Sequence, residues 1–213
     1  MSFQEFSFAA DEMDERSMWT RHNPHIGACI RSSLQPGGPV FKESRQELQF
    51  KWKMLGNLAE GRPNLGLTTD VSVYRLMQFT LRDVLIRDFG VEATTRVFFD
   101  AGKSAGIQFC ENLIDKNLSF PDFISALQGV LSQLRVGILR VEKADVENLE
   151  FTITVAEDLD CSGLPVSDEE ICTYDEGFIG GILQAYTGRE FSVTEVDCWC
   201  SGDRVCRFDA KLK

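Results

Sequence analysis

The hydrophobic and polar residues of the 213-residue chain follow two different periods, and the change of period predicts the order of its helices and strands. A period near 3.6 covers 70–89, about 92–118 and a third stretch that opens at Ser119 or Pro121. Asp70 can cap the first helix, and Gly90 can end it. The apolar stripe of this helix consists of Val73, Leu76, Met77, Leu81, Val84 and Leu85.

A period of two, typical of strands, flanks this helical region. The predicted strands are 50–54, 65–67, 136–141, 149–155, 190–197 and 205–212. The last two form a hairpin, and 136–141 and 149–155 form an antiparallel pair. Three or four helices packed against one antiparallel sheet of about four to five strands make an α+β domain.

A further helix precedes the hairpin. Ser167–Glu170 has the pattern of a capping box, and Gly188 can end the helix that it opens. Glycine inside a helix costs about 1 kcal/mol relative to alanine, so Gly177, Gly180 and Gly181 predict that another element packs closely there. In the second helix, Gly102–Gly106 places two glycines one turn apart and likewise permits close backbone approach.

Residues 1–45 are interpreted as an N-terminal arm, and 46–213 as one ligand-binding domain. The arm contains both histidines, His22 and His25, and the breaker cluster Gln35–Pro39, without sustained periodicity. A catalytic pair that needs a histidine inside the domain is therefore excluded.

Charge and composition narrow the function classes. The chain has 33 acidic and 22 basic residues, a net charge of −11, and the segment 142–176 alone holds twelve acids and one base. A chain this acidic, without a basic stripe, is a poor nucleic-acid binder, although the acidic segment could recruit a basic protein partner. The longest apolar stretches are far below the roughly 20 residues of a membrane span. Early acidic residues argue against a secretory signal, so we expect a cytoplasmic protein.

Reduced cysteines in such a compartment suggest metal binding, reactivity or burial. Five of the seven cysteines lie between Cys161 and Cys206. Glu195 shares a strand face with apolar residues, and an inward carboxylate is costly unless a cation lies beside it. Glu195, Cys198 and Cys206 could converge at the hairpin, with Cys172 joining from the preceding helix. The alternative is that these cysteines are small buried hydrophobes and that Glu195 reaches solvent.

A second metal pattern lies at 158–169, where Asp158, Asp160 and Glu169 occupy positions of an EF-hand loop. A strand precedes this loop where an EF-hand has a helix, and Pro165 removes a backbone donor. We therefore interpret the loop as a solvated turn, and its acids as a solvated face.

The sequence ICTYDEGFIGGIL at 171–183, EVDC at 195–198 and GDRVCRF at 202–208 resembles the 4-vinyl-reductase domain, a family of ligand-binding and aromatic-sensing domains. The specific similarity covers about 150–212. The resemblance implies a heme-NO-binding/TRAPP-like fold and a zinc ion held by Cys172, Glu195, Cys198 and Cys206. Four protein ligands leave no open position, so the implied zinc is structural. Cys161 and Cys200 fall outside this quartet and are interpreted as spare or buried.

The resemblance implies non-catalytic binding or sensing of a small hydrophobic molecule, which is tetrapyrrole-, aromatic- or lipid-like, and a homodimer formed through helix faces. Phenylalanines could line the pocket. The candidates are Phe98, Phe99, Phe109, Phe123, Phe151 and Phe178. Alternatives are a reductase or accessory protein acting on a chlorophyll vinyl group, for which no nucleotide motif is found, and a dimeric interaction scaffold. We expect binding rather than catalysis.

Overall fold

The computed structural model describes residues 50–167 and 171–213, so the predicted arm 1–45 lies outside the described residues. The helices are η1 (Trp52–Leu55), α3 (Leu58–Gly61), α4 (Val71–Phe89), α5 (Val91–Leu113), α6 (Phe120–Gln133), α7 (Thr173–Thr187) and η2 (Trp199–Ser201). The strands are β1 (Ile138–Asp145), β2 (Glu150–Ala156), β3 (Phe191–Asp197) and β4 (Cys206–Leu212). The predicted α+β class is confirmed.

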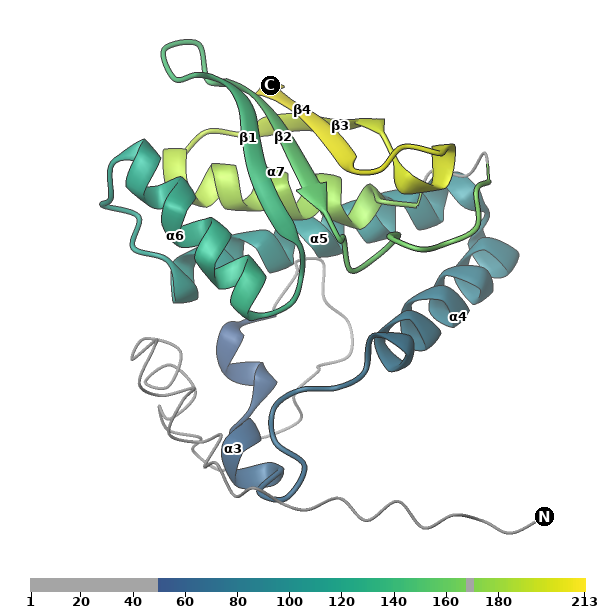
Figure 1. Cartoon of the computed structure of the whole chain (residues 1–213). Coiled ribbons are helices and arrows are strands. Elements are labelled where there is room, and N and C mark those ends of the chain that lie inside the picture. Colours follow the sequence, from purple (N-terminus) through teal and green to yellow (C-terminus); the bar gives the residue numbers. More distant parts are fainter. Residues whose placement is uncertain (1–49, 168–170) are drawn as a thin grey trace, which may run out of the picture.

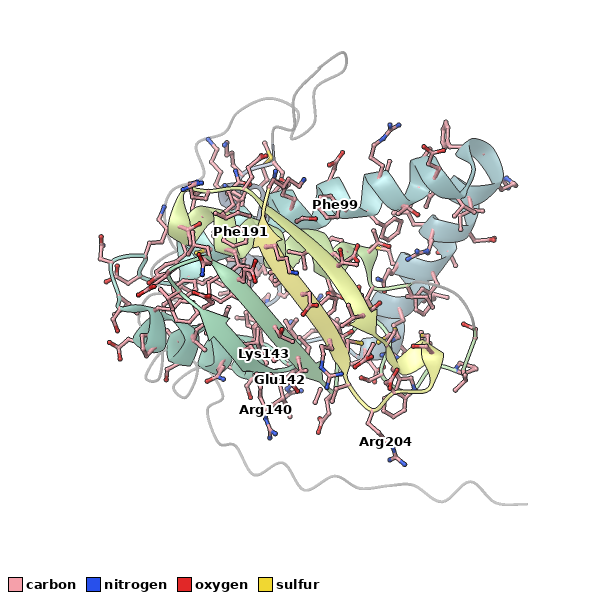
Figure 2. All side chains as sticks on the ribbon, turned by 90° about the horizontal axis from the view of Figure 1, so that it is seen from above. Phe99, Arg140, Glu142, Lys143, Phe191 and Arg204 are labelled. Carbon is pink, nitrogen blue, oxygen red and sulfur yellow. The ribbon has the colours of Figure 1, made fainter. Side chains whose placement is uncertain are left out.

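The four strands form one antiparallel sheet in the order β1-β2-β4-β3. Helices α6 and α7 lie against one face of this sheet, and α5 lies beyond α7 (Figure 1). Viewed from above, the opposite face of the sheet lies in front of the helices and carries polar side chains such as Arg140, Glu142 and Lys143 (Figure 2). No helix among the described residues is long and apolar enough to cross a membrane.

Alternation along the strands places one row of each strand in the core, as the period of two predicts. In β2 the buried row is Phe151, Ile153 and Val155. Their partners across the ladder are Ala210, Phe208 and Cys206 of β4. Glu195 of β3 pairs with Phe208, so its side chain belongs to the same inner row.

Helices α5 and α7 contact each other through their backbones. A methyl group on Gly102 or Gly106 would overlap the carbonyl oxygens of Tyr174 and Phe178. A methyl group on Gly177 or Gly181 would overlap those of Phe99 and Lys103 on α5. The numbering of these pairs increases together along both helices, so α5 and α7 run parallel. The predicted close packing is confirmed, and glycine is required because any Cβ would separate the helices.

Two predicted strands are wrong. Residues 52–55 form the short helix η1, and 65–67 form a turn and bend. A strand needs a neighbour to accept its backbone hydrogen bonds. The segment at 50–55 is instead attached to α5 by a side chain, because the backbone N–H of Trp52 donates to Gln108 Oε1 at 3.0 Å.

Two helix boundaries also differ from the prediction. The second helix ends at Leu113 rather than Leu118, because Ile114 is extended and the carboxylate of Asp115 accepts a hydrogen bond from the Asn117 backbone N–H, which builds a turn. The helix expected from Ser167 begins at Thr173. The backbone N–H of Ser167 donates to Cys200 O, while 168–170 of the proposed capping box lie outside the described residues.

Helix α4 is capped as predicted, since Asp70 accepts from the Ser72 backbone N–H, but its apolar stripe is exposed. Leu76 and Met77 are 67% and 62% exposed, whereas the one buried residue of the helix is Gln78. The helix extends away from the sheet (Figure 1). Its polar side therefore faces the domain, and its apolar side faces outward.

The backbone contact between α5 and α7 generates the first prediction. Gly106→Ala should lower the free energy of unfolding by about 1–3 kcal/mol, because overpacking forces the helices apart. Chemical denaturation monitored by circular dichroism measures this loss. Gly129→Ala in α6 is the matched control, since nothing lies within 4 Å of a methyl group there. The control should gain up to about 1 kcal/mol from helix propensity. Equal effects of the two changes would contradict the close contact.

Candidate metal centre

Four buried cysteine thiols meet at one end of the sheet. They come from different elements: Cys161 from the loop after β2, Cys172 from the N-cap of α7, Cys198 from the turn after β3, and Cys206 from the start of β4. All four sulfur atoms lie within 4.8 Å of one another. We call these residues the four-thiol group.

The sulfur separations suit a metal ion. A tetrahedral site with metal–sulfur bonds of about 2.3 Å has sulfurs about 3.8 Å apart. The Cys172 sulfur lies 3.6 Å from that of Cys198 and 3.8 Å from that of Cys206. The Cys161 and Cys206 sulfurs are closer, at 3.0 Å. The four-thiol group could therefore hold a metal ion.

Glu195 borders this group. Its backbone N–H donates to Glu176 Oε1 at 2.7 Å, which holds the end of β3 against α7. Its Oε1 is buried without a hydrogen-bond partner among the described residues. Burial raises the pKa of Glu195 to about 8, and the thiols of Cys172 and Cys198 also affect it. A cation beside this carboxylate would remove the cost of its burial.

The structure thus brings together Cys172, Cys198 and Cys206, with Glu195 beside them, as the sequence predicts. Sequence reasoning missed Cys161, which is buried but belongs to the group. The signal was the pairing of β2 with β4, because Val155 lies opposite Cys206 and the chain after Val155 must pass close to it. Cys200 is buried outside the four-thiol group, and burial raises the pKa of its thiol to about 12.

The loop that carries Cys161 is acidic and buried, so its interpretation as a solvated turn is wrong. Asp158 and Asp160 are 4% and 2% exposed. Asp158 Oδ1 accepts from the backbone N–H groups of Asp160 and Cys161, which shapes the loop. Burial, and then the charge of Asp160, raises the pKa of Asp158 to about 7. Buried acids around thiols favour a cation at this end of the sheet.

Helix α4 anchors this loop with its polar side. Tyr74 Oη donates to Asp160 Oδ1 at 2.8 Å, and Gln78 Nε2 donates to Asp160 Oδ2 at 2.7 Å. The Arg75 guanidinium donates to the backbone carbonyls of Leu159 and Ser162 at 2.8 and 2.9 Å. These contacts explain why α4 turns its polar side inward.

The six candidate phenylalanines occupy three separate places. Phe123 and Phe151 lie in the core between α6 and the sheet, and Phe109 packs edge-on against Phe178 at 5.1 Å between α5 and α7. Phe98 lies under the Arg82 guanidinium, at 5.1 Å, and Phe99 lies under Lys213. The structure does not bring all six together around one space.

Comparison with known proteins identifies the part of the chain that contains the candidate metal centre. Residues 151–212 match the model of the 4-vinyl-reductase domain, the family that the sequence motifs resemble. This segment spans β2 to β4 and supplies every member of the four-thiol group.

Two uncharacterized proteins of Methanocaldococcus jannaschii are similar in sequence. One is 26% identical over 149 residues, which cover 70% of this chain and 81% of that protein. The other is 31% identical over 120 residues, which cover 54% of this chain and 45% of that protein.

Three solved structures share the fold at low identity. The phenol-responsive sensory domain of the transcription activator PoxR, solved with phenol, has a TM-score of 0.57 at 16% identity and covers 69% of this chain and 76% of that chain. A vinyl-4-reductase family protein from Methanocaldococcus jannaschii has a TM-score of 0.53 at 16% identity, over 78% and 99%. A trafficking protein particle complex subunit 3 from Naegleria fowleri, covalently bound to palmitic acid, has 0.55 at 13%, over 67% and 95%. The expected TRAPP-like fold is confirmed, and the heme-NO-binding part of that expectation stays a prediction.

The four-thiol group generates the second prediction. We expect the purified protein to contain about one divalent metal ion per chain, since four soft ligands meet at tetrahedral spacing. Elemental mass spectrometry measures the metal content. Cys206→Ala should lose most of the metal and unfold at a lower denaturant concentration, because metal binding stabilises the folded state. Cys110→Ala removes another buried thiol, outside the group, and should keep the metal. Full metal content in Cys206→Ala would contradict the site.

Proposed function

We propose that this chain is a non-catalytic domain that binds a small hydrophobic molecule and that its four-thiol group holds a structural zinc ion. Thiolate ligands favour zinc among the common divalent ions. A site with four protein ligands has no open position for water or substrate, which argues against a catalytic metal. A reducing, cytoplasmic location fits this proposal, because the site needs free thiols.

Zinc would join three segments that are distant in sequence: the loop after β2, the start of α7 and the β3–β4 turn. Five donors compete for four positions. The family resemblance assigns Glu195 to the quartet, and the geometry also offers Cys161. The two assignments differ in the metal content of Cys161→Ser and Glu195→Gln, because loss of a ligand lowers zinc affinity more than loss of a neighbouring group.

The aromatic cluster at the junction of α6, α7 and the sheet is the observation that carries ligand binding. Phe120 stacks on Phe151 at 5.1 Å, and Phe123 stacks on Tyr186 at 3.9 Å. Phe191 of β3 lies 6.0 Å from Phe151. Ligand pockets are lined mainly by aromatic and apolar side chains. We infer that an aromatic, tetrapyrrole-like or lipid-like molecule binds beside this cluster.

The similar structures support this choice of ligand. One of them holds phenol, and another is covalently bound to palmitic acid. Both molecules are small and mostly apolar, and both proteins share this fold. Of the residues expected at the ligand, Phe123 and Phe151 lie in the cluster, while Phe109 and Phe178 pack on the neighbouring side of α7.

The third prediction tests ligand binding. Native mass spectrometry of the purified full chain should detect a co-purifying apolar molecule. Titration with phenol, palmitate and protoporphyrin, monitored by thermal shift, should find at least one that stabilises the fold. Phe123→Leu should weaken that binding several-fold by removing aromatic contact area. Phe89→Leu, at an exposed residue at the end of α4, should leave it unchanged. The absence of both a co-purifying molecule and any stabilising probe would contradict the proposal.

We also propose that the chain forms a homodimer through the exposed apolar side of α4. This side includes Val73, Leu76, Met77 and Leu81, which are all at least half exposed. A contiguous apolar face of this kind is typical of a protein interface. A 19-residue helix is about 28 Å long and can pair with its counterpart in a second copy.

The fourth prediction tests this interface. Leu76→Glu places a charge in the centre of the apolar side and should convert the dimer to a monomer in sedimentation experiments. Val146→Glu introduces the same charge at an exposed apolar residue in the β1–β2 turn and should not change the assembly. A monomeric wild-type protein, or equal behaviour of both variants, would contradict the dimer.

A further inference from the structure

A cleft of about 450 Å³ lies at the end of the sheet that holds the four-thiol group, and neither proposed function uses it. Its lining comes from the start of α4, the turn after α6, the loop after β2 and the η2 turn. This volume is within the usual range of small-molecule pockets. The aromatic cluster of α6 and α7 does not line it, so the cleft is a different place from the proposed hydrophobic site.

Three arginines line the cleft, in a protein with a net charge of −11. The guanidinium groups of Arg135 and Arg204 are exposed and have no hydrogen bond or ion pair with any described residue. Arg75 donates to backbone carbonyls of the loop after β2, so its charge is fixed at the cleft wall. Two acids are present. Glu157 is exposed, and Asp158 points its Oδ1 into its own loop, so the arginines outnumber the carboxylates.

The backbone at Arg135 adds a second observation. Its φ of 58° is left-handed, and it occupies the position after the C-cap of α6 where glycine is favoured. The Schellman hydrogen bonds are complete, since Arg135 N–H donates to Ser132 O and Val136 N–H donates to Leu131 O. Glu157, with φ of 52°, faces the same cleft. Two of the three described non-glycine residues with positive φ therefore line it, and such residues gather at binding sites.

An apolar wall completes the cleft. The indole N–H of Trp199 donates to Leu164 O at 3.0 Å, which fixes the ring beside the cleft. Trp199 follows Cys198, and Leu159 on the opposite loop precedes Cys161 by two residues. The two walls are thus the loops that carry two members of the four-thiol group, and their positions are set together.

We propose that this cleft binds a small organic anion, in which a carboxylate or phosphate group contacts Arg135 and Arg204 and an apolar body packs against Trp199. Guanidinium groups bind carboxylates and phosphates with paired, charge-assisted hydrogen bonds. The indole face suits an aromatic or aliphatic body. The site lies open to solvent, so binding is weakened by added salt.

Calorimetric titration of the full chain tests this assignment. Benzoate and phenyl phosphate carry the two anion types on the same ring, inorganic phosphate lacks the ring, and benzyl alcohol lacks the charge. We expect the charged ring compounds to bind at one site more tightly than inorganic phosphate, and benzyl alcohol to bind weakest. The preference between benzoate and phenyl phosphate identifies the anion. Equal binding of benzyl alcohol and benzoate would overturn the proposal, as would no binding of either anion.

Arginine variants locate the site. Arg135→Gln and Arg204→Gln should each weaken anion binding by about three- to tenfold, the range for loss of a charge-assisted contact at an open site. Arg135→Lys and Arg204→Lys keep the charge and should retain most of the affinity. Arg140→Gln on β1 is the control, because Arg140 is exposed and outside the cleft (Figure 2). Unchanged affinity in both Gln variants, with the folds intact by circular dichroism, would overturn the assignment.

Discussion

The backbone contact between α5 and α7 is the constraint on which the rest of the domain depends. Four glycines, Gly102 and Gly106 on one helix and Gly177 and Gly181 on the other, leave no room for a side chain between them. Because the helices touch at this distance, α7 has one position available on the inner face of the sheet. Its first residue after the N-cap follows Cys172, so the same contact determines where that thiol lies relative to β3 and β4.

Around that contact the protein concentrates groups that are costly to bury. Four thiols, the carboxylate of Glu195 and the two buried acids of the loop after β2 gather at one end of the sheet. Thiols alone would be ordinary core residues. Carboxylates beside them are not, since each buried negative charge raises the cost of the next. A dication among these groups would compensate them together, and this is why a metal site fits better than a core of small hydrophobes.

Helix α4 illustrates the same balance from the other side. Its polar residues Tyr74, Arg75 and Gln78 turn inward because the acidic loop and its carbonyls need partners. Its apolar residues are left outward, where only another surface can cover them. The helix therefore connects the candidate metal centre to the proposed dimer interface, and the neighbouring arginine cleft shares the same loop through Arg75.

The sequence by itself determined the α+β class, the inner rows of the strands, the close glycine packing and three of the four thiols, because these follow from local periodicity and residue chemistry. It also predicted a strand at 50–54 and a solvated loop at 158–160, and both were wrong. Whether an alternating segment becomes a strand depends on a neighbouring strand, and whether an acid is buried depends on partners such as Tyr74 that lie more than 80 residues away. Only the tertiary structure could add Cys161 to the four-thiol group, since the pairing of β2 with β4 brings it to Cys206. Only the tertiary structure could turn the apolar stripe of α4 outward, because the direction that an amphipathic helix faces is decided by what its polar side can bind.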